Sequence, residues 1–463
     1  MKFCIVVLLF FVSSYSPLFS GIDLDLLQSG PMVCYTEMRE VMIWIQTKKS
    51  TRVRLIYWDS TEIGNNQLYT KTTEKKNSPY FTKEISTEEN TAYTAKLIAD
   101  KVQPGKTYLY YLTFNDKKLA VSYPLKFTTP KLWKWRSEPP PFRIAVGSCV
   151  YINEPEYDRP GTPYGGGYQI FTSIYNQHPD AMLWLGDNNY LREPDWNTRT
   201  GILHRYTHSR SVKEIQPLLG SVSNYAIWDD HDFGPNDSDR GYWNKETTLE
   251  AFKLFWGNPG FGINGKPGIT TTFENSDVQL FLMDNRYYRT ADKRKTGERR
   301  ILGKEQIDWL LDNLVSSTAT FKVIAMGGQV LNPVAKYENY ATYPEEMNEL
   351  LSAIEREKIS GVVFLSGDRH HTELSKLVRI GTYPLYDLTS SPLTSSSHAD
   401  DGEQNVLRVP GTLVNQRNFA MLEFVGEKSQ RAMNISVYST EGKLLWKREI
   451  LASELQVANE KKK

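Results

Sequence analysis

Hydrophobic and polar positions follow two different patterns along the chain, and the pattern changes near residue 142. Before that point, short segments alternate with the period of two that is typical of half-buried β-strands. Residues 41–47 place Val41 and Ile43 on one face, and residues 52–58 alternate in the same way. This part of the chain therefore favours an all-β domain built from short strands.

A turn and an aromatic strand extend this prediction. A Pro-Gly turn signal precedes residues 106–115, which contain alternating aromatic side chains. This stretch resembles part of fibronectin type III (Fn3) domains, in which a tyrosine like Tyr108 ties a corner of the sandwich. We predict a small Fn3-like β-sandwich over residues 21–130, followed by a proline-rich linker over residues 131–141.

After residue 142, apolar segments suited to buried strands alternate with helical patterns, which predicts an α/β domain. The clearest helical pattern spans residues 303–317 and places leucines and an isoleucine on one face. We predict that this domain covers residues 142–450 and that residues 451–463 form a tail. The apolar segments lie in residues 142–149, 180–190, 224–232, 278–286, 321–329 and 361–371.

Composition narrows the class of protein. The 463 residues contain 55 Lys and Arg against 54 Asp and Glu, for a formal net charge of +1. Proteins that bind nucleic acid or an anionic membrane carry a clear excess of basic residues. The near-neutral charge of this chain therefore argues against either as its main partner. With 40% hydrophobic and 24% charged residues, the chain is typical of a folded protein of two or three domains.

The N-terminus predicts export. Lys2 precedes an apolar segment over residues 3–12, and small polar residues follow. This is the pattern of a signal peptide over residues 1–20, too short to span a bilayer. We therefore expect a periplasmic or secreted protein without an integral membrane segment. Its remaining cysteines, Cys34 and Cys149, fall in different predicted domains and are not expected to pair.

The six apolar segments share a feature that secondary structure does not require. Each ends in residues that can bind a metal ion or a phosphate. In α/β sheets, ligands bind beyond the carboxyl ends of the strands, so these side chains are expected to gather in one place. They are Cys149, Asp187, Asp229 with Asp230, Asp284, Gln329 and Asp368.

Two residue types in this set point to a strong Lewis acid. Asp187 and Tyr190 lie three residues apart across a turn, and a phenol binds a cation well only when the cation displaces its proton. A trivalent ion such as Fe³⁺ suits this pair, and Cys149 as a thiolate adds charge donation. Asp368 and His370 supply a carboxylate and an imidazole that point the same way if the backbone is extended.

An acidic cluster follows the third apolar segment and suits hard divalent cations such as Ca²⁺ or Mg²⁺. Several cations bridged by a carboxylate such as Asp187 can bind a phosphate ester together with its nucleophile, which favours phosphate ester hydrolysis. The members of this cluster are Asp229, Asp230, His231, Asp232 and Asn236.

Other polar groups predict smaller roles. Asp284 and Arg286 suggest a structural ion pair. His204 and His208 have a spacing that can bind zinc on a helix, but without a third ligand nearby an exposed helix face is the better prediction. Residues 165–167 are glycines and suggest a mobile loop at the site entrance.

Taken in order, GSC, GDNNY, WDDHD and LSGDRHH resemble the PhoD-like alkaline phosphatase family. The stretch FLMDNRYYR followed by ILGKEQIDWLLDNL resembles it too, and the match covers most of residues 142–400. GDNNY alone would equally resemble purple acid phosphatases, but those carry an acidic motif where this chain has Cys149. Residues 151–171 form an insertion that departs from the family pattern, and the chain after Leu393 matches weakly.

The resemblance implies an α/β metallophosphatase-type domain of two packed β-sheets flanked by helices, preceded by the Fn3-like sandwich. It implies one Fe³⁺ and two Ca²⁺ ions, with Mg²⁺ or Zn²⁺ as alternatives, acting on phosphate monoesters and diesters. The catalytic residues would be His231 and Asp230, with His231 contacting the phosphoryl group or polarising a neighbour. The iron ligands would be Cys149, Asp187, Tyr190 and His370, and the calcium ligands Asp187, Asp230, Asn236 and Asp368.

The sequence leaves three functions open. The first is an exported metal-dependent phosphatase or phosphodiesterase, and the second is a phospholipase-D-like diesterase that uses the same site. The third is a non-catalytic surface-binding protein with a degenerate metal site, which the largely intact ligand set disfavours. The sequence does not separate the first two and predicts no oligomeric state.

Overall fold

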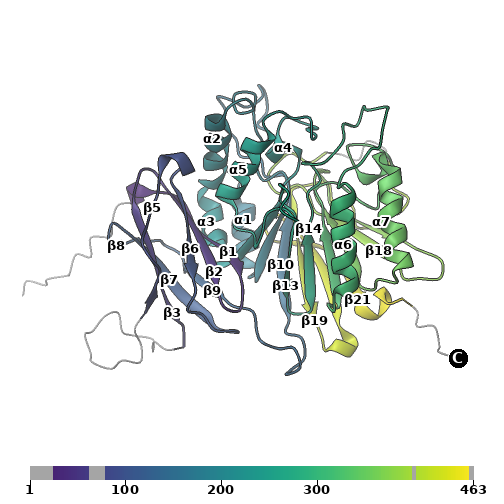
Figure 1. Ribbon diagram of the computed structural model, residues 1–463, viewed down its shortest axis with the longest axis horizontal. Coiled ribbons are helices and arrows are strands. Elements are labelled where there is room, and N and C mark those ends of the chain that lie inside the picture. The colour runs from purple at the N-terminus through teal and green to yellow at the C-terminus, as the bar shows by residue number, and fades with distance from the viewer. Residues whose placement is uncertain (1–23, 62–78, 399–402, 458–463) are drawn as a thin grey trace, which may run out of the picture.

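The computed structural model describes residues 24–61, 79–398 and 403–457. The predicted signal peptide and the last residues of the predicted tail lie outside these ranges. Figure 1 shows a set of strands from the N-terminal quarter of the chain beside a larger body of two sheets and helices.

The N-terminal strands form two sheets, ordered β1-β2-β6 and β4-β3-β7-β8, with β5 on β3 and β9 on β7. Their alternating apolar side chains enclose a core of their own. The hydroxyl of Tyr108 accepts a hydrogen bond from the backbone N–H of Gln103 at 2.8 Å, which fixes the turn before its strand. The Fn3-like assignment stays a prediction. The strands are β1 (Leu27–Thr36), β2 (Val41–Thr47), β3 (Arg52–Asp59), β4 (Tyr80–Phe81), β5 (Ile85–Ser86), β6 (Thr94–Ala99), β7 (Thr107–Phe114), β8 (Lys117–Lys118) and β9 (Lys126–Thr128).

The larger body contains two six-stranded sheets, ordered β12-β11-β10-β19-β20-β21 and β13-β14-β15-β16-β18-β17. The first comprises β10 (Phe142–Gly147), β11 (Ala181–Leu185), β12 (Ser223–Ile227), β19 (Asn418–Val425), β20 (Ala432–Ser439) and β21 (Leu444–Leu451). The second comprises β13 (Thr271–Asn275), β14 (Val278–Leu282), β15 (Phe321–Ala325), β16 (Val362–Ser366), β17 (Glu373–Leu377) and β18 (Leu385–Thr389).

Helices cover the outer faces of both sheets, and the inner faces pack on each other. Phe171 of α1 contacts Trp184 of β11, while Phe281 of β14 contacts Trp309 of α6. Phe321 of β15 and Phe424 of β19 join the sheets with ring centroids 5.2 Å apart. The helices are α1 (Gln169–Asn176), α2 (Arg199–Arg210), α3 (Gln216–Ser221), α4 (Asp230–Phe233), α5 (Lys245–Phe255), α6 (Lys304–Ser316) and α7 (Pro344–Arg356).

All six predicted apolar segments form strands, and each of the six is parallel to at least one of the others. Strands that are buried on both faces lack polar alternation, which explains their continuous apolar character. The parallel register brings the carboxyl ends of β10, β11 and β12 to one edge of the first sheet, and those of β14, β15 and β16 to one edge of the second.

The N-terminal strands are attached firmly to the larger body. Met32, Cys34 and Trp44 belong to the same hydrophobic core as the two large sheets. The indole N–H of Trp44 donates to the carbonyl of Leu254 at 2.9 Å. Cys34 and Cys149 are both buried and both free thiols.

The packed chain continues past the boundary predicted at residue 450. A 3₁₀ helix, η6 (Ala452–Leu455), follows β21. The side chain of Leu455 is fully buried, and its carbonyl accepts a hydrogen bond from the N–H of Gly361 at 2.8 Å. Within the described ranges, we find no helix whose length and apolar character would let it cross a membrane.

Candidate metal centre

Strained backbone marks the loops at the strand ends. Cys149, Asp187, Asp368 and His370 all have positive φ angles, between 51° and 65°, a region that residues with a Cβ avoid. Such strain persists only where the surrounding structure imposes it, and it gathers at functional sites. Here it turns the side chains of Cys149, Asp187 and His370 towards one group of ligand atoms. It turns that of Asp368 towards the neighbouring carboxylates. The backbone from Asp368 to His370 is not extended, so the condition under which these two side chains would point the same way is not met.

One group of ligand atoms contains a thiol, a carboxylate and an imidazole. Suitable atoms of Cys149, Asp187 and His370 all lie within 4.8 Å of one another, and the three residues are buried. The Sγ of Cys149 lies 3.6 Å from Oδ2 of Asp187. The hydroxyl of Tyr190 lies 3.2 Å from that Oδ2 and 3.3 Å from Nε2 of His370. The structure thus brings four predicted iron ligands together.

The orientation of His370 suits ligation through Nε2. Its Nδ1 lies 2.6 Å from the carbonyl oxygen of Ser396, which can only accept, so Nδ1 carries the proton. The lone pair of Nε2 then faces the Tyr190 hydroxyl. Burial lowers the pKa of His370 to about 3, so the ring is neutral at ordinary pH. Metal-binding histidines are commonly oriented by a hydrogen bond at their other nitrogen in this way.

A second set of carboxylates continues from the first group. It contains three clusters whose ligand atoms lie within 4.8 Å of one another: Asp187 with Asp230 and His231, Asp229 with Asp230 and Asp368, and Asp230 with Asp237 and Glu338. Asp187 therefore belongs to both sets, as a bridging carboxylate would. The structure places Asp368 with the carboxylates and His370 with the thiol.

The remaining predicted residues line the same region. The backbone N–H of His231 donates to Oδ1 of Asp187 at 3.3 Å, and the His231 ring lies 4.2 Å from that of Tyr190. Asn236 lines the cavity at the site and is exposed. Asp232 instead turns away, because its carboxylate accepts backbone N–H groups, including those of Asn188 and Asn189.

Without cations these groups carry a large electrostatic cost. Burial, followed by repulsion from Asp230 and other neighbouring acids, raises the pKa of Asp187 well above its usual range. Burial and the charges of nearby carboxylates also raise the pKa values of Asp368, Cys149 and Tyr190. An acidic group whose pKa is raised in this way is held in an environment that lacks positive charge.

Two buried carboxylate oxygens also lack a hydrogen-bond partner among the described residues, and Arg286 approaches one of them, Oδ1 of Asp230, only to 3.8 Å. Oδ2 of Asp229 and Oδ1 of Asp230 accept no hydrogen bond from the described residues. Unsatisfied buried carboxylate oxygens are uncommon and call for a counter-ion. The donor set, the repulsion and the unpaired oxygens all fit bound cations: the softer and phenolic donors fit a trivalent ion, and the carboxylates fit divalent ones.

Arg286 is a residue of the site whose ion-pair partners the sequence did not predict. Its guanidinium forms an ion pair with Asp229 and a bidentate pair with Glu338 at 2.9 and 3.0 Å. The predicted pair with Asp284 is wrong, because the carboxylate of Asp284 accepts the indole N–H of Trp228 and backbone N–H groups. Arg286 therefore neutralises one side of the carboxylate set.

Charge around Asp230 shows the effect of this guanidinium. Burial alone would raise the pKa of Asp230, but nearby His231 and Arg286 lower it below the usual range. Burial lowers the pKa of His231, and Asp230 opposes that shift. His231 is half-buried and lines the cavity, so its ring can contact a molecule bound there.

Two glycines allow the strand ends to approach closely. A Cβ on Gly327 would lie 2.5 Å from Cγ of Asp229, and a Cβ on Gly367 would lie 2.5 Å from the carbonyl oxygen of Leu185. No side chain fits at these distances, so glycine is required in the loops that follow β15 and β16 at the site.

The insertion at residues 151–171 forms one wall of the site. The hydroxyl of Tyr164 lies 3.3 Å from Nδ1 of His370 and 3.2 Å from Nε2 of His398. We predicted a mobile loop at residues 165–167, but Gly165 exchanges two hydrogen bonds with the side chain of Asn153. The backbone N–H of Gly166 also donates to Thr394, so the loop is tied down.

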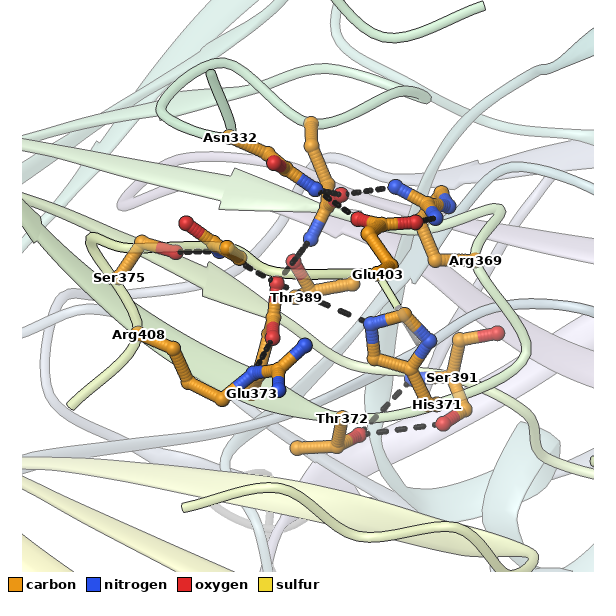
Figure 2. Close-up of polar contacts among 12 residues, drawn as sticks. Asn332, Arg369, His371, Thr372, Glu373, Ser375, Thr389, Ser391, Glu403 and Arg408 are labelled. Atoms are coloured by element: carbon orange, nitrogen blue, oxygen red, sulfur yellow. Dashed lines mark hydrogen bonds and ion pairs between the residues drawn. The ribbon is translucent and has the colours of Figure 1, made fainter. Parts of the chain in front are cut away.

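A second polar layer lies beneath the loop of β16 (Figure 2). Arg369 forms an ion pair with Glu403 and donates to Gln329, which in turn donates to Glu373 at 2.8 Å. His371 lies 3.7 Å from Glu373, which fixes the imidazole beside the cavity. This layer gives the loop a rigid base.

His204 and His208 do not line the cavity at the centre. Both belong to α2, and their rings stack with centroids 6.3 Å apart. Nε2 of His204 lies 2.9 Å from a carboxylate oxygen of Glu154. The carboxylate and the helix surface account for both side chains without a metal.

The cavity above the centre has a volume of about 350 Å³. Carboxylates, four histidines, Arg369 and the loop of residues 336–338 line it. A cavity of this size accommodates a small phosphate ester. Its lining residues are Tyr164, Asp230, His231, Asn236, Asp237, Lys336, Tyr337, Glu338, Asp368, Arg369, His370, His371, His398 and Glu403.

Comparison with known proteins gives three consistent results. Residues 269–441 match the family described as PhoD-like phosphatase. Alkaline phosphatase D of Bacillus subtilis (strain 168) is 22% identical over 341 residues, which is 62% of this chain and 54% of that protein. The chain thus aligns with about half the length of this curated relative.

Solved structures share the fold. A structure of PhoD matches with a TM-score of 0.70 at 16% sequence identity, and the match covers 94% of this chain and 93% of the PhoD chain. A purple acid phosphatase from yellow lupin (Lupinus luteus) seeds matches with a TM-score of 0.64 at 11% sequence identity. This match covers 91% of the present chain and 74% of the lupin chain. The predicted architecture of two packed sheets with helices is confirmed. Residues 269–441 are thus similar to the PhoD-like phosphatase family, and the chain as a whole shares its fold with a structure of PhoD.

Proposed function

We propose that the protein is a metal-dependent phosphoric ester hydrolase that acts on phosphate monoesters and diesters. The observation that supports this most is the convergence of buried thiol, phenol, imidazole and carboxylate groups on one cavity. Acyl or glycosyl transfer would need a nucleophile and a proton donor, not a cluster of charges that only cations can neutralise. The relatives named phosphatases support the same reaction class.

The proposed cation sites follow the two sets of side chains. Fe³⁺ would be bound by Cys149, Asp187, Tyr190 and His370, and Ca²⁺ ions by Asp187, Asp230, Asn236 and Asp368. When bound, such cations supply Lewis-acid polarisation of a phosphoryl oxygen and a water nucleophile of lowered pKa. Asn236 is the weakest member of the set, because the structure gives it a place on the cavity wall but no polar contact with the other ligands.

The chain itself contributes orientation and hydrogen bonding. His231 is half-buried beside Tyr190 and lines the cavity, so a ring N–H can donate to a phosphoryl oxygen. Asp230 is held ionised by His231 and Arg286 and fixes the loop through the backbone N–H of Asp237 at 2.7 Å. Arg286 and Glu338 hold this carboxylate edge in place, so the phosphate meets a preformed site.

Export through the N-terminal signal peptide is part of the proposal. It is supported by the apolar segment over residues 3–12. Expression of the full chain in a bacterial host should yield a mature N-terminus near residue 21 outside the cytoplasm. Recovery of the intact Met1 form in the cytoplasm alone would contradict this part.

Purified protein should be analysed for metals and assayed for phosphate release from a monoester and a diester. We expect iron and calcium to co-purify, and EGTA to lower activity reversibly. His231→Ala should lower kcat by about 100-fold, the scale of a lost transition-state contact. His178→Ala is the control, because His178 is exposed and does not line the cavity. Metal-loaded protein that hydrolyses neither ester would refute the proposal.

A further inference from the structure

Tyr337 lies at the mouth of the cavity with its ring largely uncovered. It lines the cavity together with Lys336 and Glu338, and 62% of its surface is exposed. Large aromatic side chains usually bury most of their surface in the core or in an interface. An aromatic ring that is open to solvent and borders a candidate active site is therefore available to a bound molecule.

The backbone beneath this ring is strained and held in place. Tyr337 and Glu338 both have positive φ angles, 46° and 61°, although neither is glycine. The carboxylate of Glu338 is fixed by Arg286 and Arg289, and the side chain of Asn339 donates to the carbonyl of Val334 at 2.6 Å. Consecutive left-handed residues persist only where the structure imposes them, and here the result is a ring presented at the rim.

A fixed cation supports one face of the ring. The guanidinium carbon of Arg369 lies 5.1 Å from the Tyr337 centroid, within cation–π range. Arg369 is itself immobilised by Glu403 and Gln329 in the polar layer of Figure 2. The ring is thereby supported from one side, and a rigid flat surface costs little entropy when it binds a ligand.

The charge of Arg369 also determines what the open face prefers. A cation on one face withdraws π-electron density, so a cationic group on the other face gains less attraction. A neutral aromatic ring in offset stacking gains most, because its edge and face match the ring quadrupole. A quaternary ammonium leaving group such as choline is correspondingly disfavoured.

We propose that Tyr337 is a specificity-determining residue that binds the planar aromatic leaving group of a phosphate ester. The inference rests on the proposed function and names the substrate class that the same cavity prefers. The phosphoryl group lies at the metal centre, and the leaving group stacks on Tyr337 at the rim. Tyr337 touches the substrate but takes no part in the bond that breaks.

The test compares phenyl phosphate with glycerol 3-phosphate, both assayed by phosphate release. Tyr337→Ala should raise KM for phenyl phosphate about 3- to 10-fold, the range of one aromatic stacking contact. KM for glycerol 3-phosphate should change less than twofold, and kcat for both should be preserved. Tyr337→Phe should behave as the wild type, because the ring rather than the hydroxyl makes the contact.

Trp243→Ala is the matched control, since Trp243 is 68% exposed and lies outside the cavity. Thermal unfolding of each variant establishes that the fold is intact. An equal rise in KM for both esters, or no change for phenyl phosphate, would overturn the inference while leaving the proposed function in place. Failure of the metal-loaded wild type to hydrolyse either ester would defeat the proposed function, and the inference with it.

Discussion

Replacing Asp187 with asparagine should have opposite effects in the metal-free and the metal-loaded protein. The side chain is fully buried, and its oxygens lie near Sγ of Cys149, the hydroxyl of Tyr190 and the N–H of His231, at 3.2 to 3.6 Å. The amide has the same shape: its oxygen can still accept the His231 N–H, while its NH₂ can donate to Tyr190. The substitution therefore removes charge without removing packing.

In the metal-free protein the carboxylate of Asp187 suffers repulsion from Asp230, Asp229 and Asp368, in addition to its burial. A buried polar group that lacks full compensation costs about 1–3 kcal/mol, and a charged one costs more. We therefore expect Asp187→Asn to raise the free energy of unfolding of the chelated protein by about 1–3 kcal/mol. Sites built for binding commonly gain stability when their charged groups are neutralised.

In the metal-loaded protein, Asp187→Asn should lower the free energy of unfolding instead of raising it. Cations at 100 times their dissociation constant stabilise the native state by about 2.7 kcal/mol, and a variant that has lost the bridging ligand loses this contribution. Loss of a group that merely supports metal ligands already costs about 10- to 100-fold in affinity or activity. We expect Asp187→Asn to lose at least about 100-fold in phosphate ester turnover.

The assay is urea unfolding with and without chelator, with Asp232→Asn as the matched control. Asp232 is equally buried, but its oxygens accept three backbone N–H groups at 3.0 to 3.1 Å. An amide NH₂ cannot accept, so Asp232→Asn should destabilise both forms. If Asp187→Asn destabilises the chelated protein as much as Asp232→Asn does, its carboxylate is a structural acceptor and the reasoning fails.

Three further predictions concern other parts of the structure. Arg286→Met leaves Asp229 buried without its counter-charge and leaves Glu338 paired with Arg289 alone, so urea unfolding should show a loss of about 3–5 kcal/mol; a loss near zero would contradict the buried pair with Asp229. Leu455→Ala should cost about 3 kcal/mol and the half-exposed Leu451→Ala much less, and equal losses in the same assay would mean that η6 is not packed. Above about pH 7, where unfolded histidines are neutral as well, the chelated protein should lose stability as pH rises, and added cations should remove this dependence in unfolding experiments from about pH 7 to 8.

The main features of the α/β body could be predicted from the sequence because its strands are buried on both faces. Continuous apolar segments that end in Gly-Asp or Ser-Cys identify both a strand and its carboxyl end. The parallel register, which pairs Ile144 with Ala181 and Ala181 with Ser223, then aligns the strand ends. This is why Cys149 and Asp187 were found from local sequence alone, although 38 residues separate them.

The contacts between the two sheets could not be predicted in the same way. Asp229 follows β12 in one sheet and Arg286 follows β14 in the other, so their ion pair depends on how the sheets pack. Sequence spacing favoured the local partner Asp284, but backbone N–H groups and the Trp228 indole already satisfy that carboxylate. A basic residue four positions after a buried strand was the only signal available.

Loop conformation was the other source of error. The sequence near Asp368 contains no glycine after Gly367, and we considered that the side chains of Asp368 and His370 would point the same way if the backbone were extended. Positive φ angles at both Asp368 and His370 turn the loop instead, and they send the two side chains to different clusters. Tyr337 also has a positive φ angle that the sequence did not predict. Residues with a Cβ rarely adopt this conformation, so sequence pattern gives no warning of it.

The predicted pH dependence follows from the numbers of protons that the buried acidic groups bind in the native and in the unfolded state. Asp187 and Asp368 have raised pKa values in the native state, so above an unfolded pKa of about 3.9 the native state binds more protons than the unfolded state. The free energy of unfolding then falls as pH rises, by up to about 1.4 kcal/mol per pH unit for each such carboxyl. Asp230 contributes in the opposite sense, because its lowered pKa gives stability that is present above the unfolded pKa and is lost as pH falls. Burial lowers the pKa of His370 to about 3, so His370 also opposes the carboxyls up to its unfolded pKa of about 6.5, and the carboxyl slope is measured above that pH.

A cation replaces these protons as the counter-charge. With cations bound, the carboxylates are ionised in the native state as well, so the two states bind similar numbers of protons and the slope disappears. Asp187→Asn removes one titrating carboxyl, and the slope of the chelated variant should be smaller than that of the wild type by up to about 1.4 kcal/mol per pH unit. Identical slopes for the two chelated proteins would mean that Asp187 is ionised without a cation. The positive charge that holds it would then have to come from the chain itself, with Arg286 the nearest candidate on the carboxylate side.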